Sequence, residues 1–310
     1  MTEFTEIEKK TKALYVEQHK AYIRDKSIFD RFYNMARKEE TYGLPEGYLK
    51  GKRVADIGCG NSAYFEKALY DNGCEHITCL DIGEDWIPEL TSALDVVEVP
   101  RDAYSTVSGS ATALPFDDEQ FDVTFSNGVI MHLNGIEEAE RAMSEMARVT
   151  KKGGLLYVYV AISTGIVDKY ILPAMRDAYR EVPELQKFID TLTPEKLHAA
   201  TDGLVDTARE HDPEIAAPLK SAFDSLTLDT ITFWQNVLQV PVQLGNDLSE
   251  QWGREQFEKL GFVNVKRIPS VYWKRNDMRR YLVPAHYNTD NPVANLLYGD
   301  GHIKLIGEKA

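Results

Sequence analysis

The chain contains the stretch Val54-Ala-Asp-Ile-Gly-Cys-Gly-Asn-Ser-Ala63. Its first residues are typical of a buried strand, and its small residues are typical of a tight turn that opens a helix. Glycine lets the backbone approach a ligand closely, and the first N–H groups of a helix have no partner inside the helix. The stretch therefore predicts a nucleotide-like ligand at a strand-turn-helix junction.

The turn alone fits more than one ligand. Gly58, Gly60 and Ala63 also match the G-x-G-x-x-G/A fingerprint of nicotinamide dinucleotide folds. Asp81 follows the next apolar run, where a carboxylate accepts hydrogen bonds from a ribose diol in either kind of site. Asp56 favours a different ligand, because a carboxylate at the end of the first strand repels a diphosphate and attracts a cationic or amino group.

Further motifs follow the turn in a fixed order. They are Gly109-Ser-Ala-Thr-Ala-Leu-Pro-Phe116, Gln120-Phe-Asp-Val-Thr-Phe-Ser-Asn-Gly-Val129 and Glu145-Met-Ala-Arg-Val-Thr-Lys-Lys-Gly-Gly-Leu-Leu-Tyr-Val158. Across roughly residues 50 to 160, this succession resembles the class I S-adenosylmethionine-dependent methyltransferases.

The resemblance implies S-adenosylmethionine as cofactor and assigns its contacts by motif. The first turn holds the methionine part, the acidic residue after the second strand binds the ribose, the third motif frames the adenine, and the fourth strand leads to the substrate. The cofactor residues implied are Asp56, Gly58, Cys59, Gly60, Asp81, Ile82, Ser110, Ala111 and Asn127. Ser62 and Ser110 depart from the family pattern: Ser62 replaces a third glycine, and Ser110 replaces an aspartate, so the adenine contact lacks charge assistance.

The fold class predicted is α/β, with strands near 53–57, 77–81, 105–108, 121–126, 155–161, 262–268 and 302–308. Strands that alternate with helices indicate a mostly parallel, Rossmann-like sheet with right-handed crossovers. No helix separates the sixth and seventh strands, so we expect the last strand to be antiparallel. The clearest helices are 135–149 and 252–261.

The chain divides by pattern into an N-terminal helical cap over residues 1–50, a cofactor-binding domain over 51–162 and 249–310, and a helical insertion over 163–248. Prolines cut the insertion into short helices, and its acidic residues outnumber its basic ones. We interpret the insertion, with its recurring aromatic residues, as a lid over the substrate pocket. The segment 272–281 is basic and aromatic, and lies in a long loop between the last two strands.

The charge and composition of the chain limit the classes of molecule that it is expected to bind. The formal net charge of −14 argues against nucleic acid, which is itself a polyanion. No apolar run reaches the roughly 20 residues that cross a bilayer, and no signal-peptide core is present, so we expect a cytoplasmic protein without a membrane partner. Three cysteines in no paired spacing favour free thiols over a disulfide framework or a metal site. The sequence does not predict an oligomeric state.

The reaction predicted is transfer of a methyl group to a small-molecule oxygen, nitrogen or carbon by in-line displacement, which needs positioning and desolvation but no metal. His132, just after the fourth strand, is the best placed general base, although a packed histidine is the commoner use. The residues expected to line the substrate pocket are Tyr33, Ser163, Tyr170 and Trp234.

Other readings stay open. The same cofactor site can serve attack on the aminocarboxypropyl carbon, with release of methylthioadenosine, as in enzymes that make azetidine-2-carboxylate. It also suits a non-catalytic regulator that senses S-adenosylmethionine. An NAD-dependent oxidoreductase is disfavoured by Asp56.

Overall fold

The computed structural model describes residues 4–24, 26–160, 165–224, 235, 238–241, 244, 248–268, 296 and 302–310. The chain forms two compact units. The first comprises residues 1–163, 240–269 and 302–310, and the second comprises 164–239 and 270–301. Within the described ranges, no helix is long and apolar enough to cross a membrane.

The described residues of the first unit form a seven-stranded sheet in the order β3-β2-β1-β4-β5-β7-β6. Strands β1 to β5 pair in parallel, and β7 runs antiparallel to both β5 and β6. The predicted fold class is therefore confirmed. The strands are β1 (Arg53–Ile57), β2 (His76–Asp81), β3 (Tyr104–Ser108), β4 (Phe121–Asn127), β5 (Thr150–Val160), β6 (Phe262–Arg267) and β7 (Ile303–Lys309).

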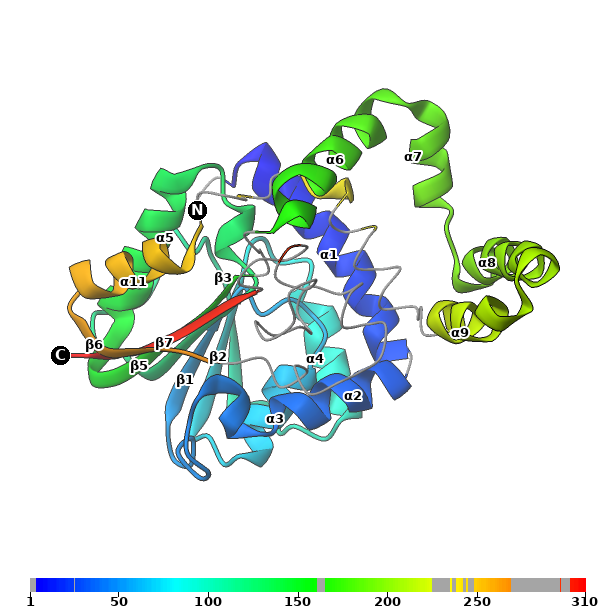
Figure 1. Cartoon of the computed structure of the whole chain (residues 1–310). Helices are drawn as coiled ribbons and strands as arrows, with labels where there is room; N and C mark the ends of the chain where they lie inside the picture. The colour runs from blue at the N-terminus through cyan, green and yellow to red at the C-terminus, as the bar shows by residue number, and fades with distance from the viewer. Residues whose placement is uncertain are drawn as a thin grey trace. The chain divides into compact units, whose positions relative to one another are not determined.

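Helices cover both faces of this sheet, as Figure 1 shows. One face packs against α5 (Ile136–Val149) and α11 (Glu250–Lys259). The other lies against α3 (Tyr64–Asp71) and α4 (Ile87–Val96), with α2 (Lys26–Ala36) packed on α3. Successive strand residues alternate between the two cores, as the period of a strand requires. Val54 and Phe125 belong to the core on the side of α3 and α4, whereas Ala55 and Ile57 belong to the core on the side of α5.

The strand order reverses at β1. The chain leaves β1 toward β2 and β3, then returns to place β4 on the other side of β1. In open parallel sheets, ligands bind beyond the carboxyl ends of the strands at such a reversal. The turn at residues 58–63 lies at this position.

The start of β5 differs from the prediction. The strand begins at Thr150 and not near residue 155, because Thr150 already pairs with Phe121 before a shift in register. Gly153 has a φ of 72°, which lets the backbone bend at the irregularity. The stretch Lys151-Lys-Gly-Gly154, expected to end the helix, therefore lies inside β5, one residue after the strand begins at Thr150.

The second unit is helical in its described part. A π-helical turn, η4 (Val167–Ile171), leads into α6 (Leu172–Glu181), α7 (Pro183–Asp190), α8 (Pro194–His211) and α9 (Pro213–Asp224). Pro183, Pro194 and Pro213 each take the first position of a helix, where the missing N–H costs nothing. Tyr179, Ile189 and Leu238 form a small core within this unit.

Candidate active site

The turn after β1 depends on two glycines in the left-handed region. Gly58 has a φ of 80° and Gly60 a φ of 62°. A Cβ added to Gly58 would lie 2.3 Å from Val129 Cγ2, in the loop after β4. Gly58 therefore serves the close approach of two loops at the strand reversal, as well as the turn itself.

Asp81, at the end of β2, holds this turn in place. Its Oδ2 accepts a hydrogen bond from Gly60 N at 2.8 Å, and its Oδ1 accepts one from Ile82 N at 2.7 Å. Burial raises the pKa of Asp81, while these two N–H groups act against that rise. Each carboxylate oxygen still has a lone pair for a further donor, such as a ribose hydroxyl.

Asp56 and Glu66 form a buried acidic pair beneath the turn. Asp56 is 2% exposed and Glu66 is 0% exposed. Asp56 Oδ1 and both carboxylate oxygens of Glu66 have no hydrogen-bond partner among the described residues. Burial raises the pKa of Asp56, and the nearby charges of Glu66 and Asp81 raise it further. Burial raises the pKa of Glu66 to about 7. Once one of them is protonated, a hydrogen bond between the two carboxyl groups raises the pKa of Asp56 and lowers that of Glu66, and the described residues give the pair no cation.

The predicted adenine and substrate-side residues lie at the ends of β3 and β4. Ser110 hydrogen-bonds with Thr112 Oγ1 at 2.9 Å and bridges to Ala113. Ala111 is buried next to it. Asn127 ends β4, opposite Tyr159 on β5. The parallel strands thus bring the predicted cofactor residues to one edge of the sheet, while their roles as ligands stay predictions.

Helix α1 (Glu6–Arg24) lies across this edge and touches the loops that follow β1, β2, β3 and β4. The contacting side chains are polar and are spaced by four, three and four residues, so they share one face of the helix. The pairs are Glu8 Oε1 with Ser110 Oγ at 2.9 Å, Lys12 with Asp85, Tyr15 with His132, and His19 with the backbone of Gly60.

His19 is the member of this stripe that lies on the cofactor turn. A Cβ at Gly60 would lie 2.6 Å from His19 Nδ1. Burial lowers the pKa of His19 to about 4, although a hydrogen bond with Asn61 opposes the shift. Asn61 also donates to Val16 O at 3.3 Å and to Glu89 Oε2 at 2.6 Å. Neutral His19 and Asn61 therefore join α1 to the turn.

His132, the predicted general base, is buried at the end of the 3-10 turn η3 (Ile130–His132). Its Nε2 hydrogen-bonds with the Tyr15 hydroxyl at 2.8 Å, and the two rings lie 5.1 Å apart. If the phenol donates, the proton of neutral His132 is on Nδ1. Its catalytic role stays a prediction.

Of the residues predicted to line the substrate pocket, the structure describes Tyr33 and Tyr170. The Tyr33 hydroxyl donates to Asp71, at the end of α3 that lies away from the cofactor turn. Tyr170 belongs to the second unit and is 65% exposed. Ser163 and Trp234 lie outside the described residues, as does the basic segment 272–281. Their assignment to the pocket stays a prediction.

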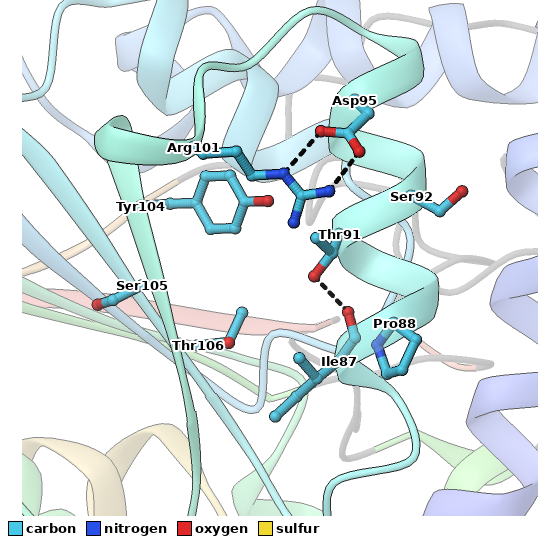
Figure 2. Close-up of a pocket in the computed structure, with 9 residues that line it drawn as sticks. All are labelled: Ile87, Pro88, Thr91, Ser92, Asp95, Arg101, Tyr104, Ser105 and Thr106. Carbon is cyan, nitrogen blue, oxygen red and sulfur yellow. Dashed lines mark hydrogen bonds and ion pairs between the residues drawn. The ribbon is translucent and has the colours of Figure 1, made fainter.

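A cavity of about 560 Å³ lies between α4 and the edge strand β3. Figure 2 shows Arg101 reaching across to Asp95 of α4, where its Nε donates to Oδ1 at 2.9 Å. None of the residues predicted for the cofactor site lines this cavity. The described residues also hold no group of three or more His, Cys, Asp or Glu side chains arranged for a metal ion.

Comparison with known proteins assigns the central strands and the turn after β1 to a protein family. The family model described as "Methyltransferase domain" matches residues 55–158, which run from β1 to β5. The chain contains a class I S-adenosylmethionine-dependent methyltransferase domain. The expected family and its cofactor are thereby confirmed.

Curated relatives of this methyltransferase domain differ in their acceptors. Malonyl-acyl-carrier protein O-methyltransferase of Enterobacter lignolyticus is 30% identical over 152 residues, which cover 49% of this chain and 53% of the relative. Demethylmenaquinone methyltransferase of Renibacterium salmoninarum is 35% identical over 113 residues, or 36% of this chain and 42% of the relative. Probable tRNA methyltransferase 9B of Mus musculus is 35% identical over 113 residues, or 36% of this chain and 22% of the relative. The chain thus spans about half or less of these relatives.

A solved structure has a similar fold. It is the complex of the Haloferax volcanii Trm112 methyltransferase activator with a putative methyltransferase, which matches with a TM-score of 0.53 and 14% identity. The match covers 97% of this chain and 96% of that one. At this identity the likeness is one of fold.

The residues of the methyltransferase site fit S-adenosylmethionine. The cofactor carries a positive sulfonium and an ammonium group, and the buried acidic pair of Asp56 and Glu66 has no cation beside it among the described residues. Asp81 presents a carboxylate with spare acceptor capacity at the position where a ribose diol is expected. The sequence analysis did not identify Glu66 or the polar stripe of α1 as parts of the site. The helical spacing of the polar residues in α1 was the signal that could have revealed the stripe.

Proposed function

We propose that the chain is an S-adenosylmethionine-dependent methyltransferase that acts on a small molecule by in-line displacement. One observation carries the proposal: Asp56, next to the last residue of β1, and Asp81, the last residue of β2, lie at the strand reversal, and Asp56 Oδ1 has no partner among the described residues under the turn that α1 contacts. Bound S-adenosylmethionine supplies a methyl group on a sulfonium, which is already a good leaving group. The work left to the chain is to orient the reactants and exclude water.

The charge of the chain and the position of α1 support a small acceptor. A net charge of −14 opposes binding of a polynucleotide. Helix α1 crosses the loops after β1 to β4, so a bulky acceptor would have to displace it. The lid role of residues 163–248 belongs to the same proposal and rests on their acidic, aromatic composition.

We place this activity in small-molecule biosynthesis in the cytoplasm. Cys59, Cys74 and Cys79 are free thiols and are all buried. Burial raises the pKa of each of them, so they are held as protonated thiols. Free thiols in this number suit a reducing compartment.

His132 and Tyr15 are the groups that would move a proton from an acceptor hydroxyl or amine. Because Nε2 of His132 is bonded to the Tyr15 hydroxyl, a proton would reach the imidazole through that hydroxyl or at Nδ1. Tyr15→Phe removes the first route and leaves the ring in place. A drop in turnover with unchanged cofactor affinity supports the relay.

The test of the proposed function is product analysis by mass spectrometry. The chain is incubated with S-adenosylmethionine, alone and with pooled small metabolites, and the adenosine products are identified. Adenosylhomocysteine formed only with an acceptor supports methyl transfer. Methylthioadenosine formed without an acceptor supports attack on the aminocarboxypropyl carbon instead, and binding without any product supports a regulator.

A further inference from the structure

One face of the sheet carries a row of polar side chains at its carboxyl edge. Asn127 of β4 pairs with Tyr159 of β5, and Tyr159 pairs with Lys304 of β7. Asp56 of β1 lies opposite Phe125, two residues before Asn127 and therefore on the same face. From β1 to β7, the polar residues on this face are therefore Asp56, Asn127, Tyr159 and Lys304, in that order.

The two ends of the row differ in charge. The acidic end, on β1 and β2, is the cofactor site. Lys304 lies three strand spacings from Asp56, or roughly 14 Å at about 4.8 Å per strand. A cationic ligand group suits Asp56 and an anionic one suits Lys304, so the two ends favour different molecules.

Lys304 is a cation that has no counter-ion among the described residues. Its Nζ lies 5.4 Å from the centre of the Tyr159 ring, and it forms no ion pair or hydrogen bond with the residues that the structure describes. Burial lowers the pKa of Lys304 to about 8, so the amine still carries its charge at neutral pH. A partly buried cation held only by an aromatic ring gains from an anion placed beside it.

Tyr159 and His302 give this end a fixed polar wall. The Tyr159 hydroxyl hydrogen-bonds with His302 Nδ1 at 2.6 Å, and His302 is 8% exposed. The Tyr159 carbonyl accepts from Gly128 N at 3.0 Å, which ties this wall to the loop that carries His132. A molecule at Lys304 would therefore lie on the same edge as the predicted general base.

We propose that Lys304, with Tyr159 and His302, binds an anionic oxygen of the methyl acceptor, such as a carboxylate. This inference rests on the proposed function, because the β1 and β2 end must be filled by the cofactor. It narrows the acceptor to a small molecule with an acidic group. Lys304 is a positioning and specificity residue in this scheme, and Tyr159 holds its ammonium group over the ring face.

The experiment uses three probes of one shape and different charge: benzoate, benzamide and benzylammonium. Their affinity is measured by ligand-observed NMR on the full chain, both alone and saturated with adenosylhomocysteine. We expect benzoate to bind about tenfold more tightly than benzamide, because a charge-assisted hydrogen bond contributes about that much to affinity. Benzylammonium should bind most weakly of the three. Benzoate that binds no better than benzamide overturns the inference.

Variants assign the effect to Lys304. Lys304→Met should remove the preference for benzoate and Lys304→Arg should retain part of it, while Lys266→Met, an exposed lysine on β6, should leave it unchanged. Adenosylhomocysteine affinity is measured on each variant. Wild-type chain that binds no adenosylhomocysteine contradicts the proposed function; Lys304→Met that binds it more weakly shows that Lys304 serves the cofactor and overturns this inference.

Discussion

At the scale of single residues, the site is defined by buried titratable groups. Asp56 and Glu66 are carboxyl groups with oxygens that lack a partner among the described residues, and His19 is an imidazole that burial holds neutral. Each has a pKa moved by burial, so each links folding or ligand binding to pH. Glu66 and His19 act in opposite directions, and single variants separate them.

Glu66 should make the chain less stable as pH rises. Its folded pKa of about 7 exceeds its ordinary value of 4.5, so the unfolded chain gives up this proton first. Stability from the neutral carboxyl is therefore full below pH 4.5 and is lost as pH rises through 7. Glu66→Gln keeps a neutral group of the same shape and should gain stability relative to the wild type between pH 5.5 and 8, measured by urea unfolding. Parallel pH profiles of the two proteins would contradict this.

Gly60 should be needed for the contact with α1 as well as for its backbone conformation. Gly60→Ala carries a left-handed penalty of about 1–2 kcal/mol and adds a collision with His19, about 1–3 kcal/mol if the contact does not relax. Gly47→Ala is the matched control, since Gly47 has a φ of 79° and open space around its Cβ position. Unfolding free energies should fall more for Gly60→Ala. An equal loss for both shows that His19 does not press on the turn.

At the scale of elements, the sequence predicts a helical cap over residues 1–50 but does not show which loops α1 contacts. The strands, α5 and α11 were predicted within a few residues, because period and turn residues are local signals. The polar stripe of α1 looks like a solvent-exposed face until the loops beyond β1 to β4 are folded beneath it. Lys304 was missed for the same reason, since only the register of β5 and β7 shows that it lies on Tyr159.

Helix α1 should become more protected when the cofactor binds. Its contacts reach Gly60, Asp85, Ser110 and His132 in the four loops around the site, so ligand that orders these loops should also order α1. Hydrogen exchange followed by mass spectrometry should show slower exchange in peptides of residues 6–24 with adenosylhomocysteine.

Lys12→Met, which removes the ion pair with Asp85, should speed exchange in α1 of the free chain and accelerate dissociation of adenosylhomocysteine. Lys26→Met is its control, because Lys26 pairs only with exposed Asp30 of its own helix. Identical exchange in α1 with and without ligand would rule out α1 as part of the cofactor site.

At the scale of the whole molecule, the sheet separates two kinds of chemistry along one edge. Carboxylates of β1 and β2 lie at one end of this edge, His132 follows β4 and hydrogen-bonds with Tyr15 of α1, and Lys304 of β7 lies over the Tyr159 ring at the other end. The methyltransferase domain accounts for the first group, and we propose that the other two groups act on the methyl acceptor. The helical second unit carries the lid proposal.

The most direct measurement is titration calorimetry of the chain with S-adenosylmethionine and with NAD. We predict saturable binding of S-adenosylmethionine and no binding of NAD. Asp81→Ala should weaken S-adenosylmethionine binding at least about tenfold, since it removes a charged acceptor, whereas Asp102→Ala, at an exposed site in η2, should not. Tight binding of NAD, or equal affinity of the Asp81→Ala variant for S-adenosylmethionine, would contradict the account.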